Sequence, residues 1–313
     1  FDGIYTGYLA SAQQVELIEQ ILDLLATPET MLIVDPVMAE NGKYYMYDSG
    51  KCWRMYNFID NSHTCNKIEN KQLFENAGRT FGNFQKYLTD YPMYTLNETI
   101  KDFHNTPKRF DNLEAAIENN FACRADTVKT EIDFAMARRA ESGRLLKLYK
   151  EGLIPLRVTH NDTKLNNILF DDETNEGICV IDLDTIMPGF SLYDFGDAIR
   201  FGANTTIEDD ENLDNVNISL ELFESYAEGF LSASAKALTK AEVENLAFSA
   251  MLITLECGIR FLTDYLDGDV YFKTKYPEHN LVRARNQFKL VYEIEQHLDE
   301  MNKIVIGIYN KYV

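Results

Sequence analysis

A short polar segment of the chain holds the residue types that phosphoryl transfer needs. It reads His160-Asn-Asp-Thr-Lys-Leu-Asn-Asn167, and its spacing is that of a kinase catalytic loop. Such a transfer requires a carboxylate that orients the attacking hydroxyl, oxygen ligands for Mg²⁺, and a cation that neutralises the developing charge. Asp162 can take the hydroxyl proton, Lys164 can reach the transferred group, and Asn167 can bind Mg²⁺ through its amide oxygen. We expect His160 to give the loop its shape by packing and hydrogen bonding.

A second metal ligand is expected at Asp182, which ends an apolar run that begins at Ile178. Asp184 follows two residues later, so in an extended chain its side chain points to the same side. The segment Asp194-Phe-Gly196 spells the metal-binding motif of protein kinases, but no apolar strand leads directly into it. We therefore assign the metal to Asn167, Asp182 and Asp184, and we expect Asp194 to hydrogen-bond the catalytic loop. The alternative is a turn network of polar residues with no chemistry.

Short strands must position these groups, and the sequence places candidates on both sides of the polar segment. Residues 158–159, 168–170 and 178–182 are apolar runs, with a turn signal at 171–175 between the last two. Loops on such a scaffold commonly carry catalytic groups. Around this small β region, apolar spacing predicts helices over residues 68–90, 111–120, 129–150, 218–236, 241–267 and 280–310.

The first 60 residues have a different pattern. Residues 10–26 have the apolar spacing of a helix and lie between two candidate strands, 4–8 and 31–34. The second strand is a continuous apolar run of the kind found in buried parallel sheets. Residues 45–60 are rich in aromatic side chains and contain the turn signal Asp48-Ser-Gly-Lys51, which predicts a β-hairpin with residues 53–59 as its second strand.

Composition restricts the partners of the chain. The formal net charge is −20, which argues against nucleic acid or an anionic membrane because both need a basic surface. A nucleotide remains compatible with this charge, since a phosphate site needs only local positive charge. The five cysteines are widely spaced, as expected of reduced thiols in a cytoplasmic protein, and the histidines lack the spacing of zinc ligands.

Residues 43–313 resemble the N-acetylhexosamine 1-kinases, within the aminoglycoside phosphotransferase and choline kinase superfamily. Six motifs carry the resemblance, spread over about 270 residues (313 less 43). They are Trp53-Arg-Met-Tyr-Asn-Phe-Ile59, Phe103-His-Asn-Thr-Pro-Lys-Arg-Phe110, Val158-Thr-His-Asn-Asp-Thr-Lys-Leu-Asn-Asn-Ile168, Ile181-Asp-Leu-Asp-Thr-Ile-Met-Pro-Gly189, Leu192-Tyr-Asp-Phe-Gly-Asp197 and Tyr271-Phe-Lys-Thr-Lys-Tyr-Pro-Glu-His-Asn280.

The resemblance implies an α+β, protein-kinase-like fold of the aminoglycoside phosphotransferase type, with a mainly helical C-lobe. It implies ATP- and Mg²⁺-dependent phosphorylation of the anomeric hydroxyl of an N-acetylhexosamine or a similar small sugar. Asp162 would be the catalytic base, with Asn167 and Asp182 as Mg²⁺ ligands. The sugar site would contain Phe201, Arg260 and Tyr271, and the hinge facing adenine would contain Phe58, Ile59 and Asp60.

Two of the sugar-site residues also have ordinary structural interpretations. An aromatic side chain beside a loop, such as Phe201, usually belongs to the core. An arginine on an apolar helix, such as Arg260, usually pairs with a buried acid, here Glu256 four residues earlier.

Residues 1–44 resemble instead a fragment of pyridoxal kinase, a ribokinase-like α/β enzyme, on the motifs Ile4-Tyr-Thr-Gly-Tyr-Leu9 and Val34-Asp-Pro-Val-Met38. This gives three expected regions: a short α/β fragment at 1–44, the hairpin and hinge of a truncated N-lobe at 45–66, and the catalytic C-lobe at 67–313. The sugar-kinase family would place a Gly-rich phosphate-covering loop before residue 45. Its absence there predicts weakened binding of Mg-ATP.

Three functions follow from these observations. The leading one is an impaired sugar 1-kinase; the second is a non-catalytic sugar-binding protein or inactive fusion product; the third, pyridoxal kinase, rests on 44 residues and lacks that enzyme's catalytic part. The stereochemistry of the sugar and the oligomeric state do not follow from the sequence.

Overall fold

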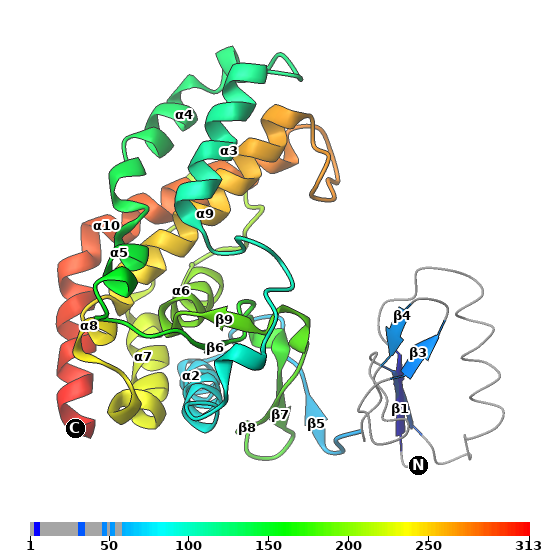
Figure 1. The fold of residues 1–313 in the computed structure, drawn as a ribbon, viewed down its shortest axis with the longest axis vertical. Helices are drawn as coiled ribbons and strands as arrows, with labels where there is room; N and C mark the ends of the chain where they lie inside the picture. The colour runs from blue at the N-terminus through cyan, green and yellow to red at the C-terminus, as the bar shows by residue number, and fades with distance from the viewer. Residues whose placement is uncertain (1–2, 7–30, 35–45, 49–50, 54–57) are drawn as a thin grey trace. The chain divides into compact units, whose positions relative to one another are not determined.

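The computed structural model describes residues 3–6, 31–34, 46–48, 51–53 and 58–313 (Figure 1). The chain divides into two compact units between Ser62 and His63. The three functional regions expected from the sequence have boundaries at other residues, 44/45 and 66/67, and they stay predictions.

The first unit contains two small sheets. Strand β1 (Gly3–Thr6) pairs in parallel with β2 (Met31–Val34), which confirms the predicted parallel arrangement of these two segments. Strand β3 (Met46–Asp48) pairs antiparallel with β4 (Lys51–Trp53) around residues 49–50, which confirms the hairpin. The predicted helix at 10–26 lies outside the described residues.

The second strand of the hairpin is shorter than predicted. It ends at Trp53, and Phe58 and Ile59 are not in a strand. The Ile59 carbonyl accepts a hydrogen bond from Ser62 Oγ at 2.7 Å, so this group is bonded within a local bend.

The second unit is mainly helical, and its helices surround one hydrophobic core (Figure 1). Helix α9 packs against α3, α6 and α10, while α2 packs against α7. The helices are α2 (Lys71–Tyr87), α3 (Thr106–Asn119), α4 (Lys129–Met136), α5 (Arg144–Lys150), α6 (Ser191–Gly202), α7 (Leu220–Ser234), α8 (Lys240–Val243), α9 (Leu246–Asp267) and α10 (His279–Tyr312).

Helix α9 is the central element of this core. Its length and mean hydropathy of 1.5 would allow it to cross a membrane, but 83% of its most apolar window is buried inside the protein. Such burial is typical of the core helix of a globular domain. The helix ends at Gly268, whose φ of 96° is the left-handed conformation that glycine adopts without a steric penalty.

Helices α2 and α7 approach each other closely because glycines lie at their contact. A Cβ added at Gly78 would lie 2.3 Å from the Tyr226 carbonyl oxygen, and one added at Gly229 would lie 1.9 Å from the Glu75 carbonyl oxygen. No side chain fits at either position. This close contact fixes α2, which carries residues that support the catalytic loop.

Two small sheets hold that loop. One has the order β5 (Ser62–His63), β7 (Ile168–Asp171) and β8 (Gly177–Val180), and the other pairs β6 (Arg157–Thr159) with β9 (Met187–Gly189) in an antiparallel manner. The polar segment 160–167 runs from β6 to β7, and Asp182 lies between β8 and β9. The two segments expected to hold catalytic groups are therefore brought together by these strands.

Several predicted helices have different bounds in the structure. The helix predicted over 129–150 is two helices, α4 and α5, separated by a 3-10 turn at Arg139–Glu141 and by Gly143. The helix predicted over 241–267 is likewise divided into α8 and α9. Helix α3 starts earlier than predicted, because Asn105 caps it by accepting a hydrogen bond from Lys108 N.

Helix α6 was not predicted. Its sequence contains two glycines and two aspartates, which have low helix propensity in isolation. All of its residues except Phe201 are buried, so tertiary packing and not propensity stabilises it.

Candidate active site

Asp162 and Lys164 lie next to each other, as predicted for a catalytic pair. The Lys164 ammonium is 2.7 Å from Asp162 Oδ1, and both side chains are partly exposed, at 36% and 27%. Asn167 Nδ2 donates to the Asp162 carbonyl oxygen at 2.8 Å and to its Oδ2 at 3.1 Å. The carboxylate thus has a fixed orientation without being sealed from solvent.

Asp194, on α6, holds this loop through hydrogen bonds to its backbone. Its carboxylate accepts the backbone N–H of His160 at 3.0 Å and that of Asn161 at 2.8 Å, and Gln85 Nε2 also donates to it. The prediction that Asp194 hydrogen-bonds the catalytic loop is therefore confirmed. Burial raises the pKa of this fully buried carboxyl, although the hydrogen bonds from the two backbone N–H groups act in the opposite direction.

His160 is a structural residue and not a wall of the cavity beside Asp162. Its Nε2 donates to the Ile181 carbonyl oxygen at 2.9 Å, and its buried ring packs edge-on against Phe81 and Phe84. Its own carbonyl oxygen accepts a hydrogen bond from Thr185 Oγ1 at 2.6 Å. The predicted packing and hydrogen-bonding role of His160 is confirmed, and its place among the catalytic residues stays a prediction.

The predicted metal ligands lie on two segments that the backbone ties together. Ile181 N donates to the Asn167 carbonyl oxygen at 3.0 Å, which places Asp182 one residue beyond this bond. Asp182 has left-handed backbone angles of φ 58° and ψ 59°, and both Asp182 and Asp184 are exposed. The two acids follow β8 closely, with Asp184 in the short 3-10 turn Leu183–Thr185.

The chemistry of this donor set fits Mg²⁺. The Asn167 amide nitrogen makes both bonds to Asp162, and its side-chain oxygen accepts no hydrogen bond within the described part of the chain. An amide oxygen and carboxylates are the hard ligands that Mg²⁺ prefers, and phosphates or water usually complete its shell. The described residues hold no group of three or more His, Cys, Asp or Glu that could bind a metal unaided.

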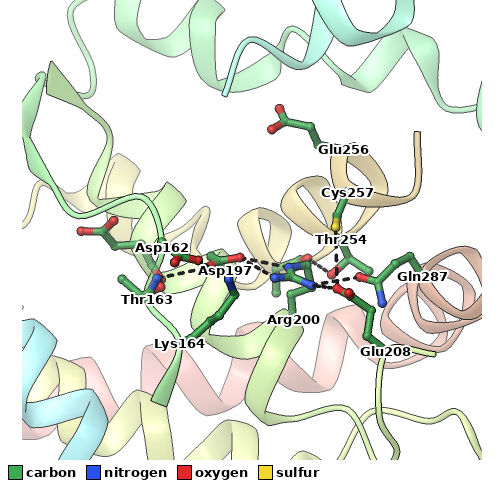
Figure 2. A network of polar contacts seen from close by, with 12 residues as sticks. Asp162, Thr163, Lys164, Asp197, Arg200, Glu208, Thr254, Glu256, Cys257 and Gln287 are labelled. Carbon is green, nitrogen blue, oxygen red and sulfur yellow. Dashed lines mark hydrogen bonds and ion pairs between the residues drawn. The ribbon is translucent and has the colours of Figure 1, made fainter. Parts of the chain in front are cut away.

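A buried ionic network continues from the loop into α6 (Figure 2). Thr163 N donates to Asp197 Oδ2 at 3.0 Å, and Arg200 Nε donates to Asp197 Oδ1 at 3.0 Å. Arg200 Nη1 reaches Glu208 Oε1 at 2.7 Å. Burial favours the neutral form of Asp197, but the charges of Arg200 and Lys164 outweigh it and lower the pKa of this carboxyl.

Lys164 stays protonated because of the same network. Burial alone would lower the pKa of its ammonium group, but the nearby carboxylates of Asp162 and Asp197 raise it above the ordinary value of 10.5. Sequence reasoning missed Asp197 and Arg200. The sequence signal that could have identified them is an acid followed by a base three residues later, a spacing at which side chains face each other on a helix. This signal was not used because no helix had been predicted over residues 191–202.

A cavity of about 480 Å³ opens beside this network, and Lys164 is one of four predicted site residues in its lining. Asp162, Arg260 and Tyr271 all line it. The Arg260 guanidinium lies 5.5 Å from the ring centres of both Phe103 and Phe272. Tyr271 is 71% exposed and is a residue of the rim. We call this space the acceptor cavity.

Glu256 does not form the ion pair with Arg260 that the structural interpretation required. It accepts a hydrogen bond from His104 Nδ1 at 2.9 Å and another from Thr106 Oγ1 at 2.7 Å. His104 and Glu256 also line the acceptor cavity, and sequence reasoning did not identify them. Nothing in the chain order links them, because they are 152 residues apart.

Phe201 is separated from the other predicted sugar-site residues. It lines a different cavity of about 620 Å³, and its partly buried ring packs against the core. Arg200 lines both cavities and lies between them. Phe201 therefore lines a different cavity from Arg260 and Tyr271, and its role in a sugar site stays a prediction.

The predicted adenine-facing residues belong to the first unit. Phe58 and Ile59 are half-buried and Asp60 is exposed at a bend. Their role at a hinge stays a prediction.

The family described as "Phosphotransferase enzyme family" matches residues 11–228 of the chain. The match begins inside the segment 1–44, so the resemblance of that segment to pyridoxal kinase has no support from it and stays a prediction.

Solved structures of small-molecule kinases are similar to the chain. An aminoglycoside phosphotransferase from Alicyclobacillus acidocaldarius is 10% identical, with a TM-score of 0.57, over 94% of this chain and 83% of that one. A choline kinase from Cryptosporidium parvum is 12% identical, with a TM-score of 0.48, over 96% and 83% of the two chains. An ethanolamine kinase from Plasmodium vivax is 15% identical, with a TM-score of 0.49; the matched region covers 78% of this chain and 66% of the ethanolamine kinase. The first of these likenesses shows a shared fold.

Proposed function

Because the chain belongs to the phosphotransferase enzyme family, whose members are small-molecule kinases, we propose that it transfers a phosphoryl group from ATP to the anomeric hydroxyl of an N-acetylhexosamine or a similar small sugar. The observation that carries the proposal is that Asp162, Arg260 and Tyr271 share the lining of one cavity of about 480 Å³. That volume is sufficient for a monosaccharide-sized acceptor. The choice of sugar rests on the sequence motifs described above.

Asp162 is the residue that acts on the acceptor hydroxyl in this proposal. Its carboxylate lies in the lining of the acceptor cavity and is held in place by Asn167. A hydroxyl bound in the cavity would donate to this carboxylate, which accepts the proton as the phosphoryl group is transferred. A correctly placed general base contributes typically about 10²–10⁴-fold to the rate.

Lys164 supplies the positive charge. It lies beside Asp162 in the same cavity lining, and its raised pKa keeps it protonated throughout the neutral range. The charge spread over the oxygens of the transferred group is the main feature that a kinase stabilises, so a fixed cation at this position favours the transition state.

Mg²⁺ would be held by Asn167 and Asp182, with Asp184 beside them, and when bound it would neutralise phosphate oxygens and position them. The chain's own contribution is two hydrogen bonds at Ile181, one from its backbone N–H to the Asn167 carbonyl oxygen and one from the His160 ring to its own carbonyl oxygen, which connect the two ligand-bearing segments. This connection orders the ligands before metal and nucleotide arrive, which reduces the entropy lost on binding.

The chain lacks a Gly-rich sequence where a kinase of this type would place its phosphate-covering loop. Residues 1–45 contain glycine only at positions 3, 7 and 42, and none of these forms a Gly-rich loop. We therefore propose a cytoplasmic kinase with impaired affinity for Mg-ATP. The same observation favours a second candidate function, a sugar-binding protein without catalysis. The pyridoxal-kinase reading is the third candidate, and it has only the N-terminal motifs in its favour.

Calorimetry separates the first two candidates. Titration of Mg-ATP into the full chain, with and without saturating N-acetylglucosamine, should give heat that depends on Mg²⁺ and a dissociation constant that decreases when the sugar is present. Binding of the sugar without any binding of Mg-ATP would instead favour the non-catalytic function. The absence of sugar binding would remove the proposed acceptor.

A further inference from the structure

The arginines of the second unit divide into two groups. Most of them form an ion pair with a carboxylate. Within the described part of the chain, the arginines with no such partner are Arg109, Arg144, Arg260 and Arg283. All of these except Arg144 line the acceptor cavity or a smaller cavity beside it. In a chain with a net charge of −20, unpaired cations collected at one place require an explanation.

The smaller cavity, which we call the side cavity, has a volume of about 300 Å³ and lies against the acceptor cavity. Arg260, on α9, lines both spaces, so it forms part of the wall between them. Arg109, on α3, lines the side cavity, and Arg283, on α10, lines the acceptor cavity. Two lysines without an ion pair, Lys101 and Lys273, add positive charge to the two linings.

Arg109 is held in an unfavourable environment. Its Nη2 donates to the Phe103 carbonyl oxygen at 2.7 Å, but its buried Nε has no hydrogen-bond partner in the described structure, and neither does the hydroxyl of Thr263 in the same lining. Burial lowers the pKa of Arg109; the charge of Glu256 acts in the opposite direction, and the positive charge of Arg260 lowers the pKa further. A buried arginine near a second cation, with two unpaired donors in the same lining, is an environment that an added anion would stabilise.

Within the described residues no carboxylate forms an ion pair with Arg109, Arg260 or Arg283, and the nearby carboxylates mostly hydrogen-bond to other groups. Glu256 accepts from His104 and Thr106. Asp264 accepts the backbone N–H groups of residues 270, 271 and 272 and the amide of Asn280. Asp267 is the exception; it lines the side cavity without an ion pair in the described part of the chain, and burial and then the charge of Asp264 raise its pKa.

We propose that the side cavity and the adjoining wall of the acceptor cavity form a binding site for an oxyanion, either a phosphate or a carboxylate. The planar forks of Arg109, Arg260 and Arg283 suit an oxyanion because each can donate parallel hydrogen bonds to two of its oxygens. The oxyanion is either free in solution or carried by the end of the acceptor that does not react. The inference rests on the proposed function only where it identifies the larger cavity as the acceptor site.

Calorimetric titration of inorganic phosphate into the full chain, without nucleotide, tests the site. Arg109→Met and Arg283→Met should each weaken phosphate binding by about tenfold or more, since each removes a charged hydrogen-bond donor. Arg144→Met is the matched control, because Arg144 also lacks a carboxylate partner but packs over Phe248 outside both cavities. It should bind phosphate like the unaltered chain. Thermal unfolding of each variant checks that it is folded.

Three results would overturn the proposal. The first is that phosphate does not bind, and the second is that Arg109→Met, Arg283→Met and the control Arg144→Met weaken binding equally. The third is that Lys164→Met abolishes phosphate binding while Arg109→Met and Arg283→Met leave it unchanged. The last result would place the phosphate at the catalytic loop. Turnover plays no part in this experiment, so a chain without kinase activity can still support the oxyanion site, and an active kinase can still fail to show it.

A second titration identifies the source of the anion. N-acetylglucosamine and N-acetylglucosamine 6-phosphate carry the same anomeric hydroxyl and differ in the phosphate at the other end of the molecule. If the anion belongs to the acceptor, the 6-phosphate should bind about tenfold more tightly than the neutral sugar, and Arg283→Met should remove the difference. If the anion is free, the two sugars should bind equally while inorganic phosphate still binds. Tighter binding of the neutral sugar, together with no binding of inorganic phosphate, contradicts the proposal.

Discussion

The carboxylate of Asp194 accepts the backbone N–H of Asn161 at 2.8 Å, and Asn161 has the left-handed backbone conformation, with φ 64°. A side chain on α6 therefore fixes an unusual turn in the loop that carries Asp162. The proposed catalytic residue, Asp162, directly follows Asn161, whereas Asp194 comes from α6, 33 residues beyond Asn161. We therefore expect substitution of Asp162 to change turnover and substitution of Asp194 to change mainly the stability of the fold.

Asp162→Asn should abolish sugar phosphorylation, with a loss of about 10²–10⁴-fold, while leaving the fold intact. The amide keeps the size of the carboxylate but cannot accept the hydroxyl proton. Turnover with N-acetylglucosamine measures the loss, and thermal unfolding measures the fold. Unchanged turnover would remove Asp162 from the mechanism.

Asp182→Ala should eliminate Mg²⁺-dependent nucleotide binding with little change in stability, because Asp182 is exposed. Asp194→Ala should act in the opposite way: it leaves two backbone N–H groups of the catalytic loop unpaired, at a cost of about 1–3 kcal/mol each in the free energy of unfolding. Nucleotide titration and urea unfolding of both variants measure the two effects. If the metal dependence follows Asp194 instead, our assignment of the metal ligand is wrong.

Arg260→Ala should raise the KM for the sugar more than the KM for ATP. The Arg260 guanidinium lines the acceptor cavity between Phe103 and Phe272 and forms no ion pair with Glu256. Steady-state kinetics of both substrates tests this, with Arg144→Ala as a control arginine outside the cavity. An equal rise in both KM values would indicate a structural role for Arg260.

Asp197 should make the stability of the second unit depend on pH in the acid range. Its folded-state pKa is lowered from 3.8, chiefly by the charge of Arg200, against the effect of burial. A lowered pKa means that the stabilisation is present above the unfolded value and is lost as the pH falls through the folded value. Asp197→Asn should therefore be less stable near neutral pH and lose less stability on acidification. Urea unfolding over a pH series checks this, and parallel curves for the two proteins would contradict it.

Replacing residues 1–44 with the first strands and Gly-rich loop typical of the sugar-kinase family should raise kinase activity by orders of magnitude. In the chain itself, the backbone amides of β2 should exchange hydrogen faster than those of β8. Among the described strands β2 pairs with β1 alone, whereas β8 belongs to a three-stranded sheet packed against α2. Exchange followed by mass spectrometry tests the second statement. A normal KM for ATP in the chain as it stands would show that the missing loop is dispensable.

The sequence by itself was sufficient for the catalytic segment. Asp162, Lys164 and Asn167 lie within six residues, so local chain geometry alone brings them together. The hydrogen bonds of Asp194 to the loop could also be predicted, because no apolar strand leads directly into this residue, whereas one leads into Asp182. The long helices were visible for the same reason: apolar periodicity over many residues is a local property of the chain.

The acceptor cavity was decided only by the tertiary structure. His104 and Glu256 meet across 152 residues, and Phe201 lines a different cavity from Arg260 and Tyr271, with Arg200 in the lining of both cavities. Helix α6 itself forms because its residues are buried, against the low helix propensity of its glycines and aspartates. Contacts between distant segments depend on how whole helices pack, and this packing is a property of the complete chain that no short window of sequence contains.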